Sequence, residues 1–152
     1  SADVYASAEV YYSIGAILSG VLVYRIFSKY NEYLSVILLM FVVSIAFLGM
    51  SFSNNLFLFF TANLILGVTN AGVRILRTTY LFSHVPNNLI GRASSVFSSI
   101  NVVIRMILIL IFSIPFFLED ENIRWGYFVG SVFMFLTVIS LLYYYYKQKK
   151  SN

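Results

Sequence analysis

Cysteine is absent from this chain of 152 residues, and histidine occurs only once, at His84. Without cysteine there is no disulfide, no thiol nucleophile and no thiolate-bound metal. A single histidine cannot supply the group of imidazoles that a histidine-based metal centre requires. We therefore expect neither a metal site nor a cofactor.

Charge is also scarce, because charged residues make up 11% of the chain and hydrophobic residues 60%. The mean hydropathy is +0.85. A soluble domain carries roughly 25% charged residues, and this chain has too few to build a water-facing surface around one core. Several apolar runs reach the length of about 20 residues that crosses a bilayer. The composition predicts an integral membrane protein.

The net charge of +4 does not indicate a nucleic-acid partner. The basic residues stand singly between apolar runs and form no patch interleaved with aromatic residues. Scattered lysine and arginine residues at the ends of apolar spans instead orient a membrane protein. We expect the lipid bilayer to be a partner of this chain and nucleic acid not to be one.

Five apolar runs separated by short breaks predict an all-α, polytopic bundle of five transmembrane helices. The expected spans are residues 4–27, 33–52, 56–82, 90–118 and 125–146. The Ser53-Asn54-Asn55 segment predicts a tight turn between the second span and the third. No linker or repeat divides the chain, so residues 1–152 are expected to form one unit.

Basic residues also predict the orientation of the bundle. Arg25, Lys29, Arg92 and the lysines of segment 147–150 fall on one side of the membrane if all five helices span it. The opposite side carries the acidic segment 119–121. The excess of lysine and arginine in cytoplasmic loops therefore places the N-terminus outside and the C-terminus in the cytoplasm.

An external N-terminus followed by an odd number of spans normally needs a preceding segment that carries this terminus across the membrane. Asp3 and Glu9 stand where a cleavable signal peptide would have its basic region. We therefore expect the sequence to be a piece of a longer membrane protein.

Polar residues recur on one face of the third and fourth expected spans. Spacings of three and four residues place them within a stripe roughly 80° wide on the third helix. The third span carries Asn63, Gly67, Asn70, Arg74 and Arg77, and the fourth carries Ser94, Ser98, Asn101 and Arg105. From these two stripes we expect a substrate cavity lined by Asn63, Asn70, Arg74, Asn101 and Arg105.

Arg105 is the strongest member of that set because of its depth. It lies about 13 residues beyond Arg92, or roughly 20 Å of helix rise. An arginine near the middle of a span costs at least about 2.5–3.5 kcal/mol on insertion scales. Arg105 is therefore expected to face protein or a water-filled cavity, and no acid deep in these spans can pair with it.

Other interpretations of the polar residues remain open. Asparagine and serine in a span often form hydrogen bonds that hold two helices together. Arg77 is close enough to the cytoplasmic interface to extend its guanidinium into it. For Arg105 the alternative interpretation is a structural ion pair with a partner outside this sequence.

Aromatic residues gather where the spans meet the expected cytoplasmic interface. Tyr33 and the run Tyr143–Tyr146 lie at this level, together with Glu32 and His84. Tyrosine combines an apolar ring with a polar hydroxyl, which suits the headgroup region. The run is therefore interpreted as an interfacial anchor, in preference to a stack that binds a ligand.

The segment between the third and fourth spans resembles the major facilitator superfamily of transporters. The residues that carry this resemblance are Gly67 to Arg77, then Val85-Pro86, then Gly91-Arg92-Ala93-Ser94-Ser95. Pro86 is expected to stop the helix, Gly91 to permit a tight turn, and Arg92 to anchor the next helix at the cytoplasmic face. Segment 20–29 is similar to a degraded copy of a loop of the same family, in which Gly20 and Arg25 survive.

The resemblance implies a function. The chain corresponds to helices eight to twelve of a twelve-helix secondary transporter, that is, part of its C-terminal six-helix bundle. Arg25, Pro86, Gly91 and Arg92 then belong to the cytoplasmic gating loops. The missing N-terminal half and a small-molecule substrate become partners, and the loop style looks most like bacterial drug or macrolide exporters in the inner membrane.

Two rival classes remain open beside the transporter. A membrane-embedded enzyme needs paired carboxylates, a histidine-bound metal or an activated nucleophile, and this sequence offers none within its spans. We therefore expect a protein that is not an enzyme. The second rival is a non-catalytic membrane subunit or assembly factor, which needs no such chemistry.

Overall fold

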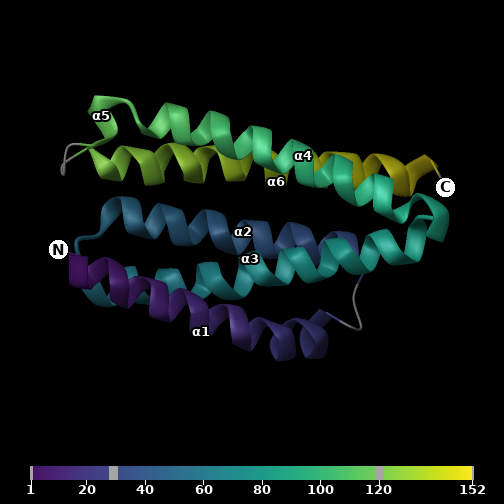
Figure 1. The fold of residues 1–152 in the computed structure, drawn as a ribbon, viewed down its shortest axis with the longest axis horizontal. Helices are drawn as coiled ribbons and strands as arrows, with labels where there is room; N and C mark the ends of the chain where they lie inside the picture. Colours follow the sequence, from purple (N-terminus) through teal and green to yellow (C-terminus); the bar gives the residue numbers. More distant parts are fainter. Residues whose placement is uncertain (1, 28–30, 119–121, 152) are drawn as a thin grey trace.

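The computed structural model describes residues 2–27, 31–118 and 122–151, and within these ranges it contains helices and no strand. The helices are α1 (Ala2–Phe27), α2 (Glu32–Phe52), α3 (Leu56–His84), α4 (Asn87–Phe112), the single turn α5 (Pro115–Leu118) and α6 (Ile123–Ser151) (Figure 1). In this described part, five helices are long and apolar enough to cross a membrane. The prediction of an all-α bundle with five candidate membrane spans is confirmed.

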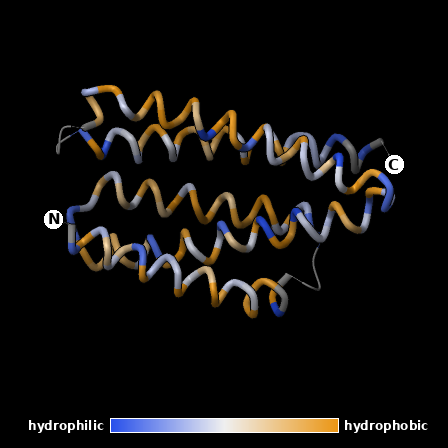
Figure 2. Tube along the Cα trace, viewed as in Figure 1, coloured by the Kyte–Doolittle hydropathy of each residue, from blue (hydrophilic) through white to orange (hydrophobic). Residues whose placement is uncertain are grey.

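Successive long helices run in opposite directions, so α1 begins at one end of the bundle and α6 finishes at the other (Figure 1). Hydrophobic residues cover most of the helix lengths, and hydrophilic residues gather mainly at the two ends (Figure 2). This is the pattern of a multi-pass membrane protein. Lys29 and segment 119–121, on which the expected orientation partly depends, lie outside the described residues.

Side-chain caps fix the starts of two helices where the sequence predicts breaks. The side chain of Asn31 accepts a hydrogen bond from the Tyr33 amide at 2.9 Å and begins α2. Asn55 accepts in the same way from the Phe57 amide and begins α3. These amides have no partner within the helix, so an asparagine cap satisfies them. The Ser53 hydroxyl also accepts from the Asn55 amide, which closes the predicted tight turn.

The fourth expected span, about residues 90–118, extends too far at its C-terminal end. Helix α4 begins earlier, at Asn87, immediately after Pro86. It finishes at Phe112, and Pro115 starts the separate turn α5. Proline has no amide hydrogen and its ring disfavours a helical residue before it, so Pro115 accounts for the break in the helix.

The expected tight turn at Gly91 is also wrong. Gly91 lies in the second turn of α4, and no glycine in the described part of the chain has a positive φ. The chain reverses instead through Val85 and Pro86, which have extended backbone between α3 and α4. Since proline is favourable at the beginning of a helix, the reversal needs no glycine.

Helices α1 and α3 pack most closely where each presents a glycine to the other. A Cβ atom on Gly67 would overlap the carbonyl oxygen of Tyr12 and lie 3.0 Å from the amide nitrogen of Ala16. A Cβ atom on Gly15 would overlap the carbonyl oxygen of Leu64. Two backbones in direct contact gain dispersion energy that lipid cannot supply, which is a common basis for helix association in membranes.

Helices α2 and α6 are joined by side-chain hydrogen bonds at three levels. The Ser131 hydroxyl, fully buried, donates to the Ser44 carbonyl at 3.0 Å. Nearer the two ends, the Ser51 hydroxyl donates to the Arg124 carbonyl at 3.3 Å and the Tyr33 hydroxyl to the Leu141 carbonyl at 3.5 Å. Small hydroxyl side chains thus let two antiparallel helices approach while their polar atoms remain satisfied.

Helix α4 differs from the other long helices because none of its residues is buried. In α2, by contrast, 39% of the residues in the apolar stretch are buried. Apart from the half-buried Ile90, its valine, isoleucine and leucine side chains are exposed. Within the described residues, α4 therefore presents an open surface on nearly every side.

Candidate functional site

The asparagines of the predicted stripe on α3 are already engaged in hydrogen bonds. The Asn63 side-chain nitrogen donates to the Phe59 carbonyl of its own helix at 2.9 Å. The Asn70 side-chain nitrogen donates to the Tyr12 hydroxyl at 2.7 Å, which links α3 to α1. For Asn70 the structure therefore realises the interhelical hydrogen bond that the sequence left open as an alternative.

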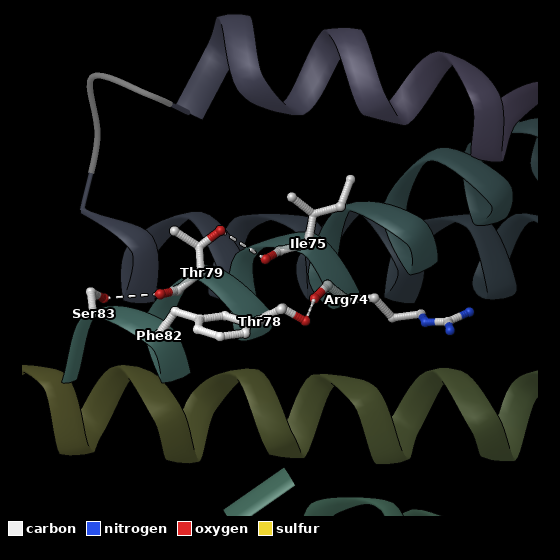
Figure 3. A pocket seen from close by; sticks show the side chains of 6 residues that line it. All are labelled: Arg74, Ile75, Thr78, Thr79, Phe82 and Ser83. Atoms are coloured by element: carbon white, nitrogen blue, oxygen red, sulfur yellow. Dashed lines mark hydrogen bonds between the residues drawn. The ribbon is translucent and has the colours of Figure 1, made fainter. Parts of the chain in front are cut away.

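Arg74 lies one turn further along α3 and borders a shallow groove of about 650 Å³ (Figure 3). All residues that line this groove belong to α3: Arg74, Ile75, Thr78, Thr79, Phe82 and Ser83. The Thr78 and Thr79 hydroxyls donate to carbonyls of the preceding turn. The exposed Arg74 guanidinium, by contrast, has no ion-pair partner in the described part of the chain and is available to bind an anionic group.

Arg77 occupies an intermediate position on the same helix. Its Nε atom is buried and has no hydrogen-bond partner, although the residue as a whole is half-buried. A buried guanidinium nitrogen without an acceptor is unfavourable. Arg77 therefore either extends into the interface or meets an acceptor that the described residues do not provide.

Asn101 and Arg105 lie on α4 and are exposed, as are Ser98 and Ser94, one and two turns before Asn101. Neither Asn101 nor Arg105 has a hydrogen bond or ion pair within the described residues. Arg105 stands among exposed apolar neighbours, including Ile104 and Met106. The middle of α4 thus carries a free guanidinium and a free amide within a strongly hydrophobic helix.

The five predicted cavity residues therefore form two groups that no described contact joins. Asn63, Asn70 and Arg74 lie on α3, while Asn101 and Arg105 lie on α4. A shared cavity lined by both groups remains a prediction. Its two strongest members are the arginines, because both are exposed and lack partners in the described part of the chain.

The predicted loop residues lie near the two connections at one end of the bundle. Arg25 is exposed in the last turn of α1. Pro86 precedes α4, and Gly91 and the exposed Arg92 lie in its second turn. A Cβ atom on Gly91 would meet nothing within 4 Å, so packing inside this bundle does not require glycine at that position.

A cluster that the sequence did not reveal lies at this same end, in a pocket of about 480 Å³. We call it the interfacial pocket, and its principal residues are Glu32, Tyr33, Tyr80, His84 and Tyr145. They come from the start of α2, the end of α3 and the last part of α6. The sequence placed Glu32, Tyr33, His84 and Tyr145 at one interface but not in one pocket, and the four-residue spacing of Tyr80 and His84 places both on one helix face.

Among the residues that the structure describes, no group of three or more His, Cys, Asp or Glu side chains is placed to hold a metal ion.

Comparison with known proteins leaves the function to be inferred from these side chains. No protein family matches this chain, and neither does any curated protein or any solved structure.

Proposed function

We propose that this chain is the C-terminal part of a facilitator-type secondary transporter, corresponding to helices eight to twelve. The whole protein would export a small molecule by alternating access, with the N-terminal half of the same transporter as partner. The observation that carries this proposal is the open, polar face of α4. Arg105, Asn101 and Ser98 lie exposed in the middle of a helix that is otherwise suited to lipid.

Lipid is a poor environment for that face. A guanidinium at the centre of a span costs several kcal/mol when only hydrocarbon surrounds it. Water or protein must therefore cover Arg105, and the described helices do not do so, because α4 has no buried residue. A second bundle that packs across α4 would supply both the cover and the other wall of a water-filled pathway.

The exposed guanidinium of Arg74 on α3 supports the same proposal. Substrate and ion sites of secondary transporters lie near the midplane, where two repeats of the fold face each other. Two arginines without acidic partners in the described residues would attract an anionic substrate group or a carboxylate of the missing half. Exposed guanidinium and amide groups supply positive charge and hydrogen bonds for a solute, and they support transport in preference to catalysis.

A second candidate is a non-catalytic membrane subunit, and the same face of α4 favours it. A separate protein that packs on α4 would cover Arg105 as well as a second half of a transporter would. The two candidates differ in the protein that packs on α4 and in whether a solute is transported. A subunit co-purifies with a partner in fixed ratio and moves no solute by itself.

Transport by the whole reading frame tests the proposal. We expect inverted membrane vesicles that contain the full protein to accumulate a fluorescent amphiphilic solute when they are energised. Because a secondary transporter is driven by an ion gradient, an uncoupler should abolish this accumulation within seconds. Vesicles without the protein are the control. Accumulation that depends on ATP and survives the uncoupler would contradict an ion-driven transporter.

The proposed orientation gives a separate prediction for single-cysteine labelling, which the cysteine-free sequence makes straightforward. Asn54→Cys lies in the exposed turn between α2 and α3, and Asn88→Cys in the exposed first turn of α4. In intact cells a membrane-impermeant maleimide should label position 54 and leave position 88 unlabelled until the membrane is opened. Labelling of position 88 from outside would show that the topology is the opposite of the proposed one.

A further inference from the structure

The interfacial pocket is walled by two stacked pairs of rings. Tyr33 of α2 and Tyr145 of α6 are nearly parallel, with ring centroids 5.8 Å apart and an interplanar angle of 14°. Tyr80 and His84 of α3 are stacked more closely, with centroids 4.1 Å apart. The faces of tyrosine rings carry partial negative charge and attract cations. The walls therefore favour a positively charged ligand that also has an apolar surface.

The charges around the pocket also favour a positively charged ligand. Glu32 is the one residue with a formal charge among the lining residues described, and it forms no ion pair in the described part of the chain. The C-terminal end of α3, which carries a partial negative charge, also borders the pocket through Tyr80, Ser83 and His84. The amide of Tyr33 at the start of α2 donates to the Asn31 side chain instead. A carboxylate that has no partner among the described residues and a helix C-terminus together attract a cation.

His84 adds a ring nitrogen to the pocket. The Nδ1 atom lies 3.1 Å from the Tyr80 carbonyl oxygen and 2.9 Å from the Ser83 hydroxyl. In the tautomer that carries its hydrogen on Nδ1, this atom donates to the carbonyl oxygen, and Nε2 is an acceptor. The site proposed below uses this tautomer. A cation that donates hydrogen bonds fits the pocket better than one that cannot.

We propose that the interfacial pocket binds a primary ammonium group through Glu32, His84 Nε2 and the faces of Tyr33 and Tyr80. The group is carried by the headgroup of an aminophospholipid or by a small soluble amine. All of these residues lie in the first or last turns of the spans Glu32–Phe52 and Leu56–His84. That position corresponds to the headgroup layer of a bilayer. The site is independent of the transport function proposed for α3 and α4.

Native mass spectrometry of the purified chain tests this site with three single-chain lipids of equal length. Their headgroups are ethanolamine, choline and glycerol. We expect the ethanolamine lipid to bind most tightly, because its ammonium donates three hydrogen bonds and the choline group donates none. The glycerol lipid, which has no cation, should bind at background level. Free ethanolamine, added in competition, distinguishes the two sources of the ammonium.

Substitutions separate the proposed contacts from a general affinity for lipid. Glu32→Gln should weaken ethanolamine-lipid binding by about tenfold or more, since a charge-assisted hydrogen bond is lost. His84→Phe keeps the stacked ring and removes the acceptor, and a smaller loss is expected. Matched controls are Glu9→Gln, an exposed acid on α1, and Tyr143→Leu, an exposed tyrosine of α6 outside the pocket.

Each outcome decides for or against the proposal. Selective loss in Glu32→Gln and His84→Phe, with both controls unchanged, supports it. Displacement of the lipid by millimolar ethanolamine also supports it and assigns the soluble amine as a ligand. Equal binding of all three lipids, or equal losses in the pocket variants and the controls, overturns it. Circular dichroism of each variant confirms that helix content is retained.

Discussion

Gly67→Ala is expected to separate α1 from α3 and to lower the free energy of unfolding by about 2–3 kcal/mol. The added Cβ atom would overlap the carbonyl oxygen of Tyr12. Its next neighbours are the Tyr12 carbonyl carbon at 2.9 Å and the Ala16 amide nitrogen at 3.0 Å. All three are backbone atoms, so no side chain can rotate to make room. One helix must move, and the close α1–α3 contact is lost along its length.

Ser19 provides a reporter of this contact. It is fully buried on α1, and its hydroxyl lies 3.3 Å from the position that a Cβ atom on Gly72 of α3 would occupy. In a Ser19→Cys background a thiol reagent should react only when α1 leaves α3. The expected loss of about 2–3 kcal/mol corresponds to labelling that is roughly 30- to 150-fold faster.

Gly91→Ala is the matched control for this prediction. A Cβ atom there would meet nothing within 4 Å, and the residue has a helical backbone without a positive φ. Alanine is more favourable than glycine in a helix by about 1 kcal/mol. Labelling of the reporter should therefore stay as slow as in the parent chain. If Gly67→Ala behaves like Gly91→Ala, the helix crossing is not as close as the structure places it.

These two glycines also show how much the sequence could predict. Hydropathy located all five spans, because long apolar runs are decided by composition alone. The polar residues Ser53-Asn54-Asn55 placed the turn after the second span, since an asparagine cap acts on residues next to it in the sequence. Hydropathy could not separate Gly67, which touches another backbone, from Gly91, which touches nothing. Both are glycines within helical segments, and only the packing of distant helices distinguishes them.

The candidate site was predictable to a similar degree. Periodicity placed Asn70 and Arg74 on one face of α3. It could not show which neighbouring helix that face contacts. In the structure Asn70 donates a hydrogen bond to the Tyr12 hydroxyl of α1, and Arg74 is exposed. The interfacial pocket was hidden because Glu32, Tyr80 and Tyr145 are far apart in the chain. The ends of three helices must be assembled before these side chains share one space.

The transport proposal predicts its largest effect at Arg105. Arg105→Leu is expected to insert into the membrane at least as well as the parent protein, because leucine replaces an arginine at mid-span. The difference on insertion scales is about 3 kcal/mol in favour of leucine. Transport by the whole protein should nevertheless fall to background. An exposed guanidinium with no partner in the described residues has no structural contact there to lose.

Arg105→Lys separates charge from geometry. Lysine keeps the positive charge and loses the planar fork that binds a carboxylate or phosphate through two parallel hydrogen bonds. We expect transport to fall by about tenfold, between the parent and the leucine variant. Uptake in inverted vesicles, normalised to the amount of protein in the membrane, gives all three rates under one ion gradient. Arg124→Leu at the start of α6 is the control for loss of a guanidinium near the end of a span.

The pair of substitutions at position 105 distinguishes three roles for this arginine. If it binds substrate or a mobile acid, the leucine variant inserts and does not transport, and the lysine variant retains part of the rate. If it forms a structural ion pair with a carboxylate of the missing half, the leucine variant leaves that acid buried alone, and the amount of folded protein falls before transport does. If it faces lipid, leucine is better on every measure and transport is unchanged. The third result would remove the open face of α4 as an argument for a second bundle, and the proposed transporter with it.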